Sequence, residues 1–191
     1  MRLFKQFITS WSEYNAKADH MTLLIMIVLI TVVMIMGDAI VFSWPDSVPR
    51  MYWALLDPIV QVILTLLIVS PLLTHPKFSG RLMRWIIITL LVTVLLDLDH
   101  FVVAGSFSLK DALNISARPA GHSLLFALAS AFVARWLMGF RAAGWLILIA
   151  LLSHIIRDAS HGGVPLLWPL PTDKFLLSYP AYLVTEITLF F

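Results

Sequence analysis

The sequence predicts an all-α integral membrane protein, a bundle of about five to six transmembrane helices whose N-terminus is cytoplasmic. Three observations predict this fold class. The chain of 191 residues is 60% hydrophobic and only 13% charged, and its mean hydropathy of +0.92 is far from that of ordinary soluble domains. It contains several apolar runs of roughly the 17–25 residues that a helix needs to cross a bilayer core. No hydrophilic stretch long enough for a separate domain divides them, so residues 1–191 are predicted to form a single domain.

The first two predicted spans follow from length and helix-boundary signals. Residues 21–42 form an apolar run that is too long for a signal-peptide core and has no cleavage pattern after it, so we expect a retained helix. Trp44 and Pro45 then indicate an exit from the bilayer. The second span is expected to begin at Asp57-Pro58, because Asp caps helices and Pro suits a first turn, and to end near Leu73.

The remaining elements follow in order. A basic loop leads to a third span at 84–104, and a polar connection covers 105–121. A fourth span at 122–138 is joined by a tight basic turn to a fifth at 145–159. Residues 162–171 are too rich in Gly and Pro to be helical throughout, and 178–191 form an apolar terminal helix that is short for a full crossing.

The distribution of basic residues predicts the orientation. Short loops on the cytoplasmic side of a membrane carry more Lys and Arg. With the N-terminus inside, the inner set has more members than the outer set. The inner set is Arg2, Lys5, Lys17, Lys77, Arg81, Arg84, Arg135 and Arg141, and the outer set is Arg50, Lys110, Arg118, Arg157 and Lys174.

Ionisable residues interrupt the third span. The stretch Leu95-Leu-Asp-Leu-Asp-His-Phe101 places two carboxylates and an imidazole in an apolar run that extends from Trp85 to Ala104. Such groups are expensive inside a membrane unless they are paired, bound to a metal or hydrated, so they indicate a functional site.

The predicted topology brings further ionisable residues to the same membrane depth. The third span ends outside, the fourth begins there and the fifth ends there. Spacing supports the convergence, because an i, i+3 pair and an i, i+4, i+7 series each lie on one helical face. Asp99 points elsewhere on an ideal helix, so it either supports the other residues from behind or requires a local break. The residues expected to converge with it are Asp97, His100, His122, His154, Asp158 and His161.

Imidazoles and carboxylates gathered in this way are typical of a divalent metal site. The chain has no cysteine, which leaves His, Asp and Glu as ligands. A single buried His or Asp more often makes an interhelical hydrogen bond, but so many ionisable groups together favour metal or catalytic use. Asp38 and Glu186 are expected to be packing or supporting groups. The net charge of +2 is scattered over loops, which excludes a basic stripe for nucleic acid.

Three stretches resemble the YdjM-like family of inner-membrane proteins, which are described as membrane-bound metal-dependent hydrolases. They are the Asp97-Leu-Asp-His100 motif, the segment from Arg118 to Phe126, and His154-Ile-Ile-Arg-Asp158 running into the 162–169 loop. Together they cover roughly residues 85–170, and their order and spacing are specific. The resemblance implies a hydrolase in a bacterial-type inner membrane, although a motif does not by itself establish an activity.

The chain also departs from the family pattern. Leu96 stands where Pro usually precedes the first Asp, and Ala117 stands where a His is usual. His161 occupies a position that usually holds Thr, so His161 either compensates for the missing His or changes the number of metal ions.

The leading hypothesis is a membrane-embedded hydrolase with an outward-facing site for one or two divalent ions, zinc before manganese. Its partner is a lipid or lipid-linked ester or phosphoester. Asp99 is the candidate general base for a metal-bound water, and Arg118 and Arg157 are candidates to hold a phosphate or oxyanion. The expected metal ligands are Asp97, His100, His122, His154, Asp158 and His161.

Two alternatives belong to other classes. A metal, ion or proton transporter also places His and Asp inside helices. A non-catalytic membrane protein can use a metal to join its helices, and such a site would be fully coordinated by protein.

Overall fold

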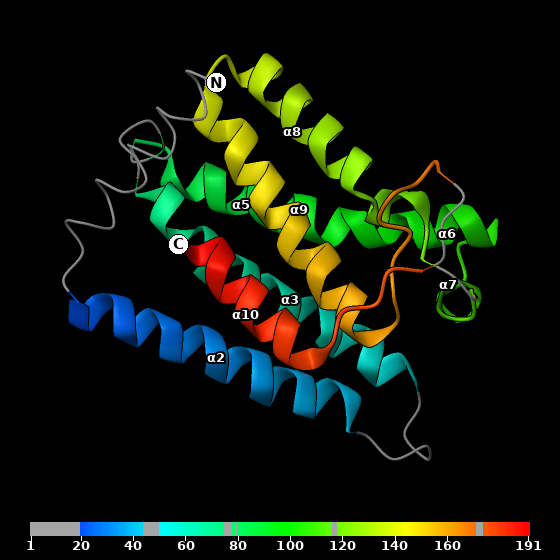
Figure 1. The fold of residues 1–191 in the computed structure, drawn as a ribbon. Coiled ribbons are helices and arrows are strands. Elements are labelled where there is room, and N and C mark those ends of the chain that lie inside the picture. The colour runs from blue at the N-terminus through cyan, green and yellow to red at the C-terminus, as the bar shows by residue number, and fades with distance from the viewer. Residues whose placement is uncertain (1–19, 44–49, 75–77, 79, 116–117, 171–173) are drawn as a thin grey trace.

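The structure, a computed structural model, describes residues 20–43, 50–74, 78, 80–115, 118–170 and 174–191. The predicted exit at Trp44 and Pro45, and the basic residues at 2, 5, 17 and 77, lie outside the described residues. Figure 1 shows the arrangement of the helices. They are α2 His20–Phe42, α3 Arg50–Leu73, α5 Leu82–Leu95, α6 Asp99–Ala104, α7 Leu109–Leu113, α8 Leu124–Met138, α9 Arg141–His161 and α10 Tyr179–Phe190.

The all-α membrane bundle is confirmed. Four segments of the described residues are long and apolar enough to cross a membrane, and the 15-residue α8 is a shorter apolar helix. The terminal helix α10 has 12 residues, in line with the expectation that it is short. The four candidate spans are His20–Phe42, Ala54–Leu73, Leu82–Ala104 and Arg141–His161.

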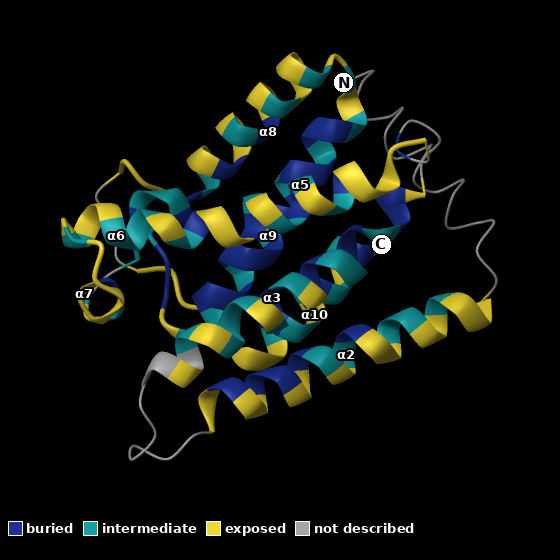
Figure 2. Ribbon diagram, turned by 180° about the vertical axis from the view of Figure 1, so that it is seen from behind, coloured by how far each residue is buried: buried dark blue, intermediate teal, exposed yellow. Residues whose placement is uncertain are grey.

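Helix α9 lies at the centre of the bundle. It contacts α3, α5, α8 and α10, whereas α2 packs on α3 and α10 at one side. Figure 2 shows α9 largely buried and α2 with one long exposed face. Most side chains on α9 therefore lie in the interior of the protein rather than in lipid.

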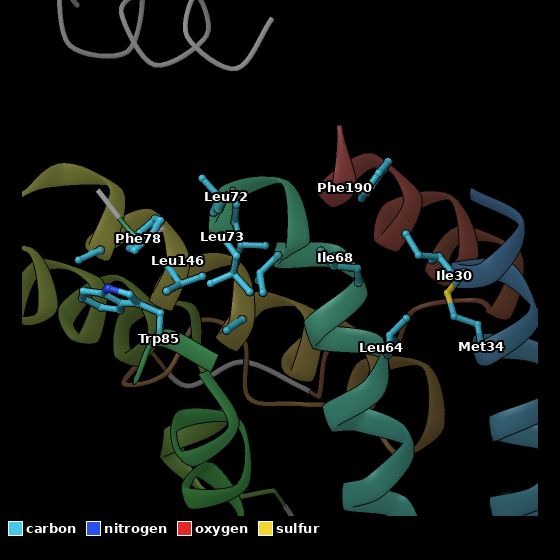
Figure 3. Close-up of a cluster of buried hydrophobic side chains, with 14 of the residues drawn as sticks. Ile30, Met34, Leu64, Ile68, Leu72, Leu73, Phe78, Trp85, Leu146 and Phe190 are labelled. Carbon is cyan, nitrogen blue, oxygen red and sulfur yellow. The ribbon is translucent and has the colours of Figure 1, made fainter. Parts of the chain in front are cut away.

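The apolar core fills the half of the bundle away from the charged motif. Figure 3 shows the cluster running from Trp85 and Leu146 at one end, through Ile68 of α3, to Ile30 of α2 at the other. Trp85 closes it with edge-to-face contacts to aromatic rings of the turns beside it. Buried polar side chains also lie on these helices, among them Thr65 of α3 and Thr89 of α5.

One predicted boundary is wrong. Helix α3 begins at Arg50, not at Asp57-Pro58, and both Pro58 and Pro71 lie inside it. Proline removes one backbone donor, which a helix packed between neighbours tolerates. Asp57 does not act as the expected cap because its carboxylate accepts a hydrogen bond from Arg157 at 2.6 Å.

Close packing of α8 on α9 depends on Gly144. A Cβ at this position would lie 2.9 Å from the carbonyl oxygen of Ala131 and 3.1 Å from Cβ of Arg135. We therefore expect Gly144→Ala to push the two helices apart and to destabilise the protein by about 1–3 kcal/mol, the usual effect of overpacking. Thermal unfolding of the purified protein in detergent measures the change.

The matched control is Gly80→Ala, because no heavy atom lies within 4 Å of an added Cβ there. Equal melting temperatures for the two variants would contradict the close approach of α8 and α9.

Candidate metal centre

The third span is broken at the acidic motif. Helix α5 ends at Leu95, residues Leu96–Leu98 form a 3₁₀ turn, and α6 begins at Asp99. A tighter turn changes the angle between successive side chains, so Asp97 and Asp99 are not fixed on the faces that an ideal α-helix gives them. The local break that the position of Asp99 suggested is therefore present.

His122 is held at the entrance to α8. It ends a 3₁₀ turn at Ala120–His122, and the next residue, Ser123, caps α8 by accepting a hydrogen bond from the amide of Phe126 at 3.3 Å. The amide of Leu124 donates to the carbonyl of Leu166 at 2.9 Å, which ties this turn to the loop after α9. The fully buried imidazole therefore has a fixed position.

Gly121 allows this turn to approach the acidic motif. A Cβ on Gly121 would collide with the carboxylate of Asp99. Only glycine leaves the space for that carboxylate, so the turn and the break in the third span fit one another.

Four side chains from three separate segments converge on one point, which we call the four-donor group: Asp97, His122, His154 and Asp158. Nε2 of His122 lies 3.1 Å from Oδ2 of Asp158 and 3.6 Å from Oδ1 of Asp97. Nε2 of His154 lies 3.4 Å from Oδ1 of Asp97 and 3.5 Å from Oδ2 of Asp158. Each histidine thus presents the same ring nitrogen to the same two carboxylate oxygens. The acidic motif directly precedes α6, and α6 and the C-terminal end of α9 both lie toward the right-hand end of the bundle in Figure 1.

The spacing of these atoms fits a tetrahedral metal ion. Zinc binds His nitrogen and carboxylate oxygen at about 2.0–2.2 Å, and a tetrahedron with such bonds has edges of about 3.3–3.6 Å. Three of the four distances lie at or beyond 3.4 Å, which is long for an N–H···O hydrogen bond. Nε2 of His122 and Oδ2 of Asp158 are buried and have no hydrogen-bond partner among the described residues. The four residues therefore fit a divalent metal better than they fit one another.

Charge supports the same conclusion. Two carboxylates gather around neutral or protonated imidazoles in a site where Asp158 is 6% exposed and His154 is 4% exposed. Burial alone lowers the pKa of His122, but the carboxylates of Asp158, Asp97 and Asp99 outweigh it and raise this pKa to about 11. A bound metal must displace the proton, so the apparent affinity for metal rises with pH.

Asp99 and His100 lie on the other side of the His122 ring, in what we call the Asp99 group, formed by Asp99, His100 and His122. Oδ2 of Asp99 lies 3.4 Å from Nδ1 of His122, whereas the four-donor group uses Nε2. Because the two ring nitrogens point apart, Asp99 does not face the four-donor group. We therefore no longer assign Asp99 as the general base for water on a metal held there.

Arg118 is beside the four-donor group, as predicted. Its Nη2 lies 2.9 Å from Oδ1 of Asp158, and its side chain is 17% exposed. An Arg carries five N–H donors in a planar fork, so Arg118 can orient Asp158 and also bind an oxyanion at the solvent side.

Arg157 and His161 belong elsewhere, which corrects their predicted roles. Arg157 donates from Nε to Asp38 at 3.0 Å and from Nη1 to Asp57 at 2.6 Å. His161 stacks on Phe42, and its Nε2 lies 3.8 Å from Asp38. Residues on the same helical face can still lie at different depths, because seven residues advance a helix by about 10 Å. His161 is therefore two turns beyond His154.

These residues form a second polar set, the Arg157 cluster, defined as Asp38, Asp57, Gln61, Arg157, His161 and Tyr179. Asp38, expected to be a packing or supporting group, accepts hydrogen bonds from Arg157 and from the hydroxyl of Tyr179 at 3.2 Å. Glu186 is fully buried on α10. Asp57 and Gln61 were not predicted from the sequence as partners of Arg157. Their i, i+4 spacing on an apolar helix was the available signal.

Comparison with known proteins adds the family. The model of a family described as "YdjM inner membrane protein" matches residues 56–191, which include the four-donor group. Transmembrane protein 267 of Danio rerio is 36% identical over 102 residues, 49% of this chain and 45% of that protein. Transmembrane protein 267 of Xenopus laevis is 33% identical over 103 residues, 50% of this chain and 46% of that protein.

The match thus spans less than half the length of these curated relatives. No solved structure matches the chain. With a family model matched over most of its length and an all-α membrane bundle as its fold, the chain belongs to the YdjM inner membrane protein family.

Proposed function

We propose that this chain is a membrane-embedded metal-dependent hydrolase that acts on a lipid or lipid-linked ester, with a phosphoester favoured. The observation that carries the proposal is the four-donor group, whose donor atoms are spaced for a divalent metal at one end of the helical bundle. Zinc is favoured over manganese because two imidazoles accompany two carboxylates.

A metal held by Asp97, His122, His154 and Asp158 would supply a Lewis acid and would lower the pKa of bound water toward neutrality. Catalytic zinc sometimes takes a fifth ligand, and such an expansion would make a place for water beside the four protein donors. Asp97 is 30% exposed, so it connects the group to solvent. The carboxylate of Asp97, in place of Asp99, is the candidate to accept a proton from the attacking water.

Arg118 is the residue proposed to select a phosphoester. It is partly exposed, is held by Asp158 and keeps further N–H donors in its guanidinium. A phosphate oxygen placed beside it would receive a charge-assisted hydrogen bond, which strengthens as negative charge develops in the transition state.

The surroundings of the group favour a substrate with an apolar tail. Beside the acidic motif, α6 exposes Val102 and Val103 at 79% and 59%, and Phe107 in the following turn is fully exposed. Apolar side chains at this density are usual where a protein faces lipid acyl chains. A lipid tail could stay in the bilayer while its head group reaches the four-donor group.

One specific observation favours a second candidate function, a metal that joins helices without catalysis. Four protein donors complete a tetrahedral zinc site, and structural zinc sites are closed in this way. A transporter is the third alternative, since buried polar side chains such as Thr65 and Thr89 also lie on the spans. Hydrolysis measurements separate the enzyme from the structural site, and flux across proteoliposomes tests the transporter.

Metal binding is the first expected outcome. The purified chain in detergent should hold zinc after loading and desalting, and His154→Ala and Asp158→Ala should each lose the ion held by the four-donor group, because both are buried donors. Elemental analysis by mass spectrometry measures the content. His161→Ala is the matched control, since it removes an imidazole from the same helix without touching the four-donor group.

Hydrolysis is the second expected outcome. Arg118→Gln should lower kcat/KM for a lipid phosphoester by about ten-fold or more, the value of one hydrogen bond to a charged group. The kcat/KM for an uncharged carboxylic ester should change less, and Arg118→Lys should recover part of the loss. His154→Ala should abolish both activities while the protein still inserts into the membrane. No turnover of any lipid ester by zinc-loaded wild-type protein would reject the hydrolase and leave the structural site.

Sidedness can be measured directly because the chain has no cysteine. Phe107→Cys places a thiol at the exposed turn beside the metal centre, and Arg141→Cys places one at the exposed start of α9, the opposite end of that helix. We expect a membrane-impermeant maleimide to label Phe107→Cys on intact cells and Arg141→Cys only after lysis. The reverse pattern would put the site on the cytoplasmic side.

A further inference from the structure

His122 faces donor atoms on both sides of its ring. Its Nε2 belongs to the four-donor group, and its Nδ1 is directed at Oδ2 of Asp99, 3.4 Å away. The side chain is fully buried, and neither ring nitrogen has a hydrogen-bond partner among the described residues. A buried imidazole with two unpartnered nitrogens is costly, so a ligand is needed on each side of it.

The residues on the Nδ1 side are those of a metal site. Both carboxylate oxygens of Asp99 and Nε2 of His100 are also buried without a hydrogen-bond partner in the described chain. One ligand atom from each of Asp99, His100 and His122 lies within 4.8 Å of the others. The rings of His100 and His122 are 5.3 Å apart and tilted by 44°, so they are not stacked face to face.

Local structure holds this arrangement open. The 3₁₀ turn at Leu96–Leu98 lets Asp97 and Asp99 serve opposite nitrogens of one imidazole. Gly121 supplies the space for the Asp99 carboxylate, because a Cβ there would overlap it. The space at Gly121 serves Asp99, which is not a member of the four-donor group.

We infer that Asp99, His100 and Nδ1 of His122 form a second divalent-metal site, and that His122 bridges two ions through its two ring nitrogens. The inference rests on the metal-binding part of the proposed function, not on hydrolysis. The three protein ligands leave at least one coordination position for water or for a substrate oxygen, which is the pattern of a catalytic site. A bridging imidazole loses both N–H protons, which pass to solvent as the metals bind.

A competing account needs no second ion. Nδ1–H of His122 can donate to Asp99, which would only fix the tautomer of a ligand to a single metal. The distance of 3.4 Å is long for that bond. It also leaves the Nε2 atom of His100 and the second oxygen of Asp99 unexplained. The two accounts differ in the number of metal ions and in the effect of His100.

The test is metal stoichiometry of the purified full chain, loaded with zinc and desalted. Wild type should hold two zinc ions per chain, and Asp99→Asn and His100→Ala should each hold one. His154→Ala should also hold one zinc ion, because it removes a ligand of the four-donor group on the Nε2 side of His122. His161→Ala, whose ring lies against Phe42, should keep two. One ion in wild type, or two ions in both Asp99→Asn and His100→Ala, would overturn the second site.

A spectroscopic measurement on wild type avoids any effect of substitution on folding. When the protein is loaded with two equivalents of Cu²⁺, a bridging imidazolate would couple the electron spins of the two ions. The ordinary electron paramagnetic resonance of Cu²⁺ should then be largely lost. His100→Ala should restore an uncoupled signal from one ion. Two uncoupled Cu²⁺ signals in wild type would exclude the bridge. Two metals without hydrolysis would reject only the proposed enzyme, whereas hydrolysis with one metal would reject only the second site.

Discussion

The need to satisfy ionisable groups inside an apolar bundle is the constraint on which the rest of this structure depends. Each such group needs a partner, because its burial without one costs several kcal/mol. Helix α9 carries the partners of both polar clusters on its buried C-terminal half. The side chains of His154 and Asp158 are directed at the acidic motif and His122, whereas Arg157 donates hydrogen bonds to α2 and α3. The two clusters together add polar contacts to the apolar packing that links α9 to α2, α3 and the segments around Asp97 and His122.

The two clusters resolve their charges in different ways. In the Arg157 cluster a guanidinium lies between two carboxylates at 2.6 and 3.0 Å, and only its Nη2 atom has no hydrogen-bond partner among the described residues. In the four-donor group the carboxylates meet imidazoles at mostly longer distances and without hydrogen bonds at several buried atoms. A structural role accounts for the two short ion pairs of the first cluster. A positive ion would complete the second, and this difference locates the proposed chemistry.

The sequence predicted the fold class and the residues of the four-donor group, because apolar runs report spans and ionisable residues within them are rare. Asp97, His122, His154 and Asp158 were all identified from their depth in the predicted topology. The roles of Arg157 and His161 could not be predicted from a helical face, because rise along the axis and the reach of a long side chain decide which neighbour each one meets. Asp57 was misread as a cap because Pro58 suggested a helix start, whereas tertiary contacts extend α3 beyond it. The position of Asp99 depended on a 3₁₀ turn whose extent no pattern in the sequence fixes.

Membership of the YdjM inner membrane protein family covers the segment that contains every residue of the four-donor group, and the relatives named transmembrane protein 267 share part of the chain. The central claim is that His122, His154, Asp97 and Asp158 bind one metal ion together. X-ray absorption at the zinc edge tests this claim most directly. The measurement uses protein loaded with one equivalent of zinc. The account predicts two imidazole nitrogens and two carboxylate oxygens at about 2.0–2.2 Å. A zinc shell made of water oxygens, with no imidazole scattering, would contradict it.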